Sequence, residues 1–105
     1  MADIMKILQQ AQQMQGRLQQ IQDELAQQTV SANAGGGMVT VEADGKGQVR
    51  SVKIDPSVVN PADVEMLEDL VLVAVTEAQK KAAALAQQEM GKLTGGMDLS
   101  FKLPF

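Results

Sequence analysis

The glycine-rich stretch ANAGGGMVTVEADGKG, from Ala32 to Gly47, is the part of the sequence that most resembles a site for chemistry. Glycines followed by a lysine can form a loop whose main-chain amides hold phosphate groups. The spacing does not fit such a loop, because Thr40 stands where the first glycine is needed and Lys46 precedes a glycine instead of a hydroxyl residue. A dinucleotide-binding pattern also fails, since the third glycine is missing and a strand pattern follows the run. We therefore predict that these glycines form turns of a small sheet.

Side chains suited to catalysis are scarce in this chain. It has 105 residues with no His and no Cys, which removes the usual nucleophile and base pairs, thiolate metal ligands and disulfides. Glu65, Glu68 and Asp69 share one face of a predicted helix and could hold a metal ion. Acidic residues in the first turns of a helix more often complement its dipole and cover an exposed face. We predict a non-enzymatic protein with no metal and no cofactor.

The N-terminal segment has the pattern of one long helix. Apolar residues recur there at alternating steps of three and four, the heptad spacing of a helix that packs against another helix. They are Ile4, Ile7, Ala11, Met14, Leu18, Ile21 and Leu25. A helix of about 25 residues measures about 37 Å at a rise of 1.5 Å per residue, which is too long for a small domain to cover. It must project from the domain or pair with another helix.

Alternating polar and apolar residues between Val30 and Ile54 predict three short strands. Asp44 to Gly47 should form a hairpin turn, and the alternation slips by one residue near Arg50, which predicts a β-bulge. Asn60 then has the character of a helix N-cap, and the helix that it opens should continue to about residue 93. The expected fold is α+β: a long N-terminal helix, a three-stranded antiparallel sheet and a long second helix.

The second helix is apolar almost all round between Leu70 and Val75, which predicts burial on two sides. In a chain of this size, a second copy is the expected source of the second covering surface. We expect the interface of this homodimer to include Val39, Val41, Leu70, Val71, Leu72 and Val75.

Positive charge is expected to gather at the helix ends that lie away from the sheet. The net charge of −4 argues against a polyanionic partner unless cations are locally concentrated. If the two helices pack antiparallel, Lys6, Arg17, Lys80, Lys81 and Lys92 meet at these ends, opposed by Asp3 and Glu89. Lysines late in the second helix could simply complement its dipole. Lys6 and Arg17 gain nothing from the dipole of the first helix, so we predict phosphate contacts at this end.

The whole chain resembles the YbaB/EbfC family of bacterial nucleoid-associated proteins. The stretches that carry the resemblance are MADIMKILQQAQQMQGRLQQIQDEL, GGGMVTVEADGKGQVRSVKID, MLEDLVLVAVTEAQKKA and the GGM…PF ending, in that order. The resemblance implies a tweezer-like homodimer that binds double-stranded DNA through helical arms and contributes to nucleoid organisation and gene regulation. It also implies one domain over residues 1–94, followed by a C-terminal tail over residues 95–105.

The sequence predicts no association with membranes. No segment approaches the roughly 20 apolar residues of a membrane span, and the N-terminus lacks the apolar run of a signal peptide. We therefore expect a cytoplasmic protein located at the nucleoid. An alternative remains open, in which the heptad stripe and the apolar second helix make the chain a scaffold for a DNA-repair or replication protein.

Overall fold

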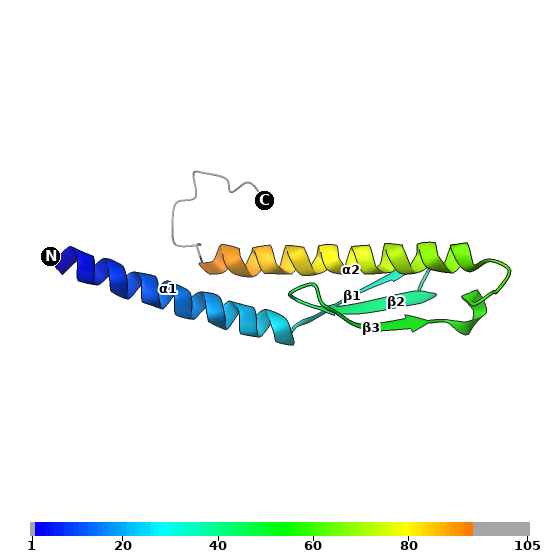
Figure 1. Ribbon diagram of the computed structural model, residues 1–105, viewed down its shortest axis with the longest axis horizontal. Coiled ribbons are helices and arrows are strands. Elements are labelled where there is room, and N and C mark those ends of the chain that lie inside the picture. The colour runs from blue at the N-terminus through cyan, green and yellow to red at the C-terminus, as the bar shows by residue number, and fades with distance from the viewer. Residues whose placement is uncertain (1, 94–105) are drawn as a thin grey trace.

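The computed structural model describes residues 2–93, which form two long helices and one sheet (Figure 1). Helix α1 spans Ala2–Gln27 and helix α2 spans Val64–Leu93. Between them lie strands β1 (Thr29–Ala34), β2 (Val39–Asp44) and β3 (Val49–Ile54), paired antiparallel in the order β1-β2-β3, and the short 3-10 helix η1 (Pro56–Val58). The predicted α+β order is confirmed, whereas the predicted tail over 95–105 lies outside the described residues.

The hydrophobic core lies between α2 and one face of the sheet. Helix α2 runs over β1 and β2, where Ala74 and Ala78 on the helix meet Val39 and Val41 on β2. All four side chains are fully buried. The small side chains of Ala74 and Ala78 allow the backbone of α2 to approach the sheet closely. All the residues of this core come from one chain.

The glycines are structural, as the sequence predicts. Gly35, Gly36 and Gly37 all have positive φ between 64° and 96°, which lets the chain turn from β1 into β2. In the turn between β2 and β3, Gly47 adopts the left-handed conformation, with φ of 88°. The predicted bulge is also present, because Glu42 pairs with Ser51 while Ala43 pairs with Val49, which leaves Arg50 as the extra residue of β3.

Helix α2 begins later than the sequence suggests. Asn60 does not cap the helix, because its side-chain oxygen accepts a hydrogen bond from the Ala62 amide within a separate turn. The carboxylate of Asp63 accepts a hydrogen bond from the Met66 amide at 3.2 Å and so occupies the capping position. Asp63 lies three residues after Asn60, so the helix begins that much later than predicted.

Helix α1 leaves the sheet and extends well beyond it (Figure 1), so the molecule is 72 Å long but only 26 Å by 16 Å across. Its last turns are anchored, with Leu25 buried and Leu18 and Ile21 half-buried. The preceding segment, residues 3–17, is exposed at every position. We refer to residues 3–17 as the α1 arm.

Candidate nucleic-acid interface

The hairpin between β2 and β3 holds the base of the α1 arm. The Gly45 amide donates to the carbonyl oxygen of Leu25 at 2.8 Å and also reaches that of Gln28 at 3.1 Å. A Cβ atom at position 45 would lie 2.7 Å from the Leu25 oxygen, so glycine is required here by close approach. The hairpin therefore satisfies a carbonyl at the end of α1 and fixes where the arm leaves the sheet.

A buried carboxylate organises this hairpin. Asp44 accepts hydrogen bonds from the amides of Lys46 at 2.9 Å and Gln48 at 3.0 Å, and from the Arg50 guanidinium at 2.8 Å. Burial would raise the pKa of Asp44, but the two amides, the hydrogen bond from Arg50 and its positive charge together hold that pKa below its ordinary value of 3.8. The charged form of Asp44 thus stabilises the β2–β3 hairpin, which is hydrogen-bonded to the end of α1.

Two of the predicted DNA-binding cations lie on the α1 arm. Lys6 and Arg17 are both exposed, and neither forms an ion pair with another residue in the described part of the chain. An exposed, unpaired cation keeps its full charge available to a phosphate group without first breaking an internal contact. The arm therefore presents two cations to the solvent away from the acidic part of the protein.

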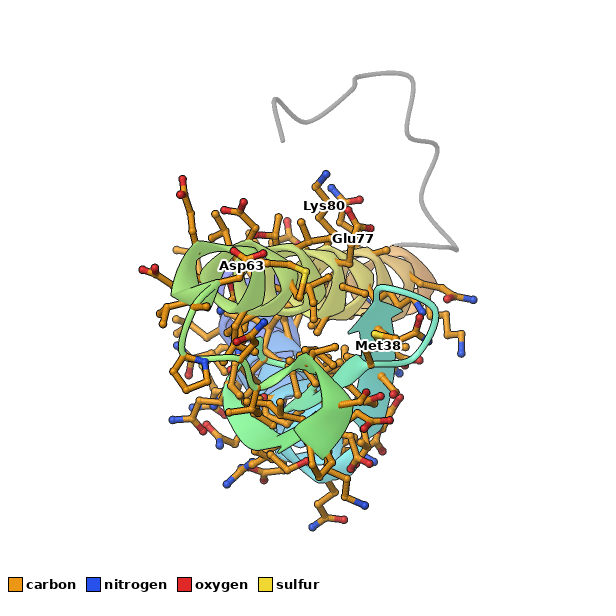
Figure 2. The ribbon with its side chains drawn as sticks, turned by 90° about the vertical axis from the view of Figure 1, so that its right-hand side faces the viewer. Met38, Asp63, Glu77 and Lys80 are labelled. Atoms are coloured by element: carbon orange, nitrogen blue, oxygen red, sulfur yellow. The ribbon has the colours of Figure 1, made fainter. Side chains whose placement is uncertain are left out.

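Each of the three predicted cations of α2 has a partner within the chain. Lys80 projects from the side of α2 turned away from the sheet (Figure 2) and pairs with Glu77 at 3.6 Å, while Lys92 pairs with Glu89 at 3.3 Å. The Lys81 Nζ donates to the Ser31 carbonyl of β1 at 2.7 Å. The expectation that Lys81 lies away from the sheet is wrong, because this hydrogen bond places Lys81 beside β1.

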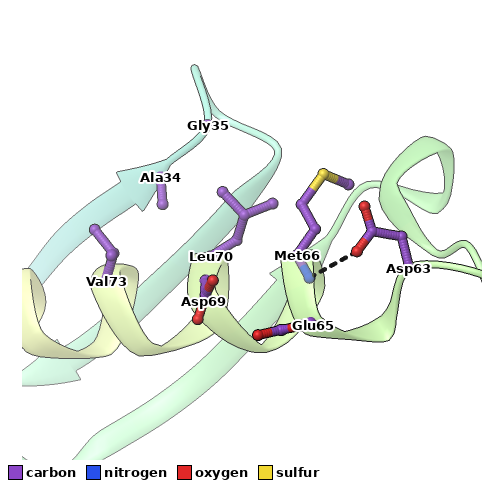
Figure 3. Close-up of a pocket in the computed structure, with 8 residues that line it drawn as sticks. All are labelled: Ala34, Gly35, Asp63, Glu65, Met66, Asp69, Leu70 and Val73. Atoms are coloured by element: carbon purple, nitrogen blue, oxygen red, sulfur yellow. Dashed lines mark hydrogen bonds between the residues drawn. The ribbon is translucent and has the colours of Figure 1, made fainter.

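The opposite end of the molecule is acidic. An open pocket of about 440 Å³ lies where the turn after β1 meets the first turns of α2 (Figure 3), with Met66, Leu70 and Val73 among its apolar lining. Asp63, Glu65 and Asp69 stand around it. Carboxylates in this position repel phosphate groups. Among the residues that the structure describes, no group of three or more possible ligands is arranged to hold a metal ion.

The residues predicted for the dimer interface lie in three different places. Val39 and Val41 belong to the core of the single chain and have no exposed surface. Leu70 packs beside Gly35 at the first turn of the sheet. Val71, Leu72 and Val75 precede Gln79 on one side of α2, and Gln79 donates to the Gly47 carbonyl in the turn that leads into β3. These three residues therefore lie on the flank of α2 nearest to β3.

Strand β3 carries exposed apolar residues that are not among those predicted for an interface. Ile54, Val52 and Val49 pair with Val39, Val41 and Ala43, so they lie on the sheet face that α2 packs against. They remain 38%, 43% and 40% exposed because α2 covers β1 and β2 instead. We call Val49, Val52 and Ile54 the open face of β3. The sequence signal for this face was the strand register, which the alternation of apolar residues and the β-bulge together define.

Comparison with known proteins extends this picture. The model of the YbaB/EbfC DNA-binding family matches residues 1–97. A nucleoid-associated protein of Gemmatimonas aurantiaca is 60% identical over 98% of this chain and 99% of its own length. A second, from Desulfotalea psychrophila, is 45% identical over 92% of each chain. The crystal structure of an uncharacterized protein from Helicobacter pylori has the same fold, with a TM-score of 0.69 at 21% identity over 87% of this chain and 91% of its own.

None of the helices in the described part of the structure is long and apolar enough to cross a membrane. The prediction of a non-enzymatic protein agrees with the family and with the names of these relatives. Because the family model covers nearly the whole chain and the similarity to relatives is high over the same span, the chain belongs to the YbaB/EbfC DNA-binding family.

Proposed function

We propose that this protein binds double-stranded DNA as a homodimer, is located at the nucleoid, and contributes to nucleoid organisation and gene regulation. The observation that carries the proposal is the α1 arm, which presents unpaired Lys6 and Arg17 in a protein of a DNA-binding family. Lys80 and Lys92 on exposed parts of α2 add to these cations. The pair of Lys80 with Glu77 is exposed on both sides and weak, so a phosphate can replace the Glu77 carboxylate at little cost.

The proposed homodimer buries the open face of β3. Val52 and Ile54 face the α2 side of the sheet but are not covered by α2, and Leu72, on the flank of α2 nearest to β3, is 65% exposed. An apolar surface that spans a strand and a helix flank is costly in water, and a second copy offers the same surface in a two-fold arrangement. Of the residues that the sequence suggested, Val71, Leu72 and Val75 fit this interface, whereas Val39 and Val41 lie in the core and Leu70 lines the acidic pocket.

The net charge of −4 makes DNA binding dependent on the positions of a few cations. Each phosphate neutralised by a cation contributes about 0.9 to the slope of log affinity against log salt concentration. A homodimer doubles the number of contacts, so binding should be strongest at low salt and fall steeply as salt increases. The acidic end around Asp63 and Glu65 should face away from the DNA.

A scaffold for a DNA-repair or replication protein remains the second candidate, because the α1 arm exposes Ile4, Ile7 and Leu8. Gel-shift titration of double-stranded DNA between about 50 and 200 mM salt separates the two functions. The proposed function requires a shift that fades steeply over this range. If no shift appears even at the lowest salt concentration, the DNA-binding proposal fails and the scaffold is favoured.

A further inference from the structure

The α1 arm carries an apolar stripe that no other described element covers. Ile4 and Ile7 are 61% and 62% exposed, and Leu8 beside them is 57% exposed. Helix α2 and strand β2 contact α1 near its base, where Leu25 is buried. Three large aliphatic side chains within five residues at this exposure are characteristic of a surface that binds another apolar surface.

The spacing along the stripe indicates what covers it. In heptad notation Ile4 and Ala11 are a positions, and Ile7 and Met14 are d positions. In an antiparallel pair of identical helices each a residue lies beside a d residue of the other. Aligning residue 4 with residue 14 also aligns residue 7 with residue 11, so every a and d position of the arm meets an apolar a or d position of the second copy. The stripe is therefore complementary to itself.

The residues that flank the stripe fit the same alignment. On one side, the g positions place Asp3 of each copy beside Arg17 of the other, which gives two ion pairs. The two Gln10 side chains lie beside each other on the same side. On the other side, the e positions bring the two Leu8 side chains together at the two-fold axis. The exposed Leu8 thus gains an apolar partner, and the unpaired Arg17 gains a carboxylate.

From these observations we propose that the α1 arms of two copies pair as a short antiparallel coiled coil, with Ile4, Ile7, Ala11 and Met14 at its centre and Asp3 beside Arg17 at its ends. The contact is separate from the open face of β3, so a protein that uses both contacts links homodimers into larger assemblies. Helical segments of about three turns are marginal by themselves. The pairing should accordingly be weak and concentration-dependent. Lys6, at an outer position, stays free for phosphate.

Disulfide trapping without DNA tests the pairing. The chain has no Cys, so Leu8→Cys introduces a single thiol at the proposed two-fold axis, and Gln9→Cys places one on the outer side of the same arm. Under mild oxidation we expect Leu8→Cys to form a covalent pair at least about ten times faster than Gln9→Cys. Equal rates, or faster linking through residue 9, would overturn the proposal. Because DNA is absent, failure here leaves the proposed function standing.

Charge exchange provides a second measurement that does not alter the apolar stripe. Asp3→Arg and Arg17→Asp should each weaken the association of homodimers by about 3- to 10-fold in sedimentation equilibrium, since each replaces two ion pairs by two repulsive pairs. The double variant, with both residues exchanged, restores the pairs and should return to within about twofold of the original. If the double variant is as weak as the single variants, the antiparallel alignment is wrong.

Discussion

The amide nitrogen of Gly45 lies 2.8 Å from the carbonyl oxygen of Leu25, and this hydrogen bond ties the β2–β3 hairpin to the last turns of α1. The Leu25 side chain is buried at the same place. Residues 3–17 are exposed throughout, so the position of the α1 arm depends on this junction. A small turn in the sheet thereby determines where the exposed cations of the arm are held.

Replacement of Gly45 by alanine should weaken the junction. The new Cβ would meet the Leu25 oxygen at 2.7 Å, so either the hairpin or the helix must move and the hydrogen bond is strained. We expect Gly45→Ala to lower the free energy of unfolding by about 1–3 kcal/mol, measured by urea denaturation. Gly16→Ala is the matched control, because a Cβ there meets nothing within 4 Å and should stabilise α1 by about 0.5–1 kcal/mol. Equal effects of the two substitutions would refute the role of Gly45.

Stability should depend on the charge of Asp44 at acidic pH. Hydrogen bonds to its carboxylate hold its pKa below 3.8 in the folded chain, whereas the unfolded chain has the ordinary value. The stabilisation is therefore complete above the unfolded pKa and is lost as pH falls through the lower folded pKa. Asp44→Asn should melt at a lower temperature than the wild type at pH 7, with the difference shrinking below about pH 4. A difference that stays constant down to pH 3 would contradict this, and the exposed Asp69→Asn serves as control.

The open face of β3 should be needed for the homodimer. Val52→Glu places a charge on that face, while Lys53→Glu places the same residue on the opposite face of the strand. We expect Val52→Glu to raise the dissociation constant of the homodimer by at least about 100-fold in sedimentation equilibrium, and Lys53→Glu to change it by less than about threefold. Circular dichroism verifies that both variants remain helical. A folded Val52→Glu variant that stays dimeric would rule out this interface.

Neighbouring lysines on α2 should differ in their contribution to DNA binding. Lys80 is directed to solvent, whereas the ammonium group of Lys81 donates to the Ser31 carbonyl. Removing Lys80 deletes a cation that is free to reach a phosphate group. Removing Lys81 deletes a cation whose ammonium group is already hydrogen-bonded to β1. Lys80→Gln should therefore lower DNA affinity more than Lys81→Gln, by about threefold or more at low salt. A larger effect of Lys81→Gln would show that its contact with β1 is released on binding.

Most of the fold follows from local patterns in the sequence. The heptad spacing of α1, the alternation of the strands and the slip at Arg50 each reflect a repeat that backbone geometry imposes. The start of α2 was placed too early because Asn60 and Asp63 both suit a helix cap, and only tertiary context selects Asp63. Helix boundaries depend on such choices between nearby residues.

The candidate site was less predictable because it depends on how far α2 runs over the sheet. The sequence shows that Lys80 and Lys81 lie late in a long helix, but not that the sheet extends beneath Lys81. Likewise, Val39 and Leu72 are both apolar, and the sequence alone does not show which of them is buried. One is in the core and the other is exposed because α2 covers β2 and leaves β3 open. These differences come from packing between elements distant in the chain.

The most direct test of the proposed DNA contact is the salt dependence of binding in two double variants of equal charge. Lys6→Gln with Lys92→Gln removes cations from the two helices, and Lys46→Gln with Lys53→Gln removes two exposed cations from the hairpin and β3. If all four helix cations of a homodimer contact phosphates, the first variant should lower the slope of log affinity against log salt by about 3 to 4, with little change for the second. Equal slopes in both variants and the wild type would contradict DNA binding through the helices.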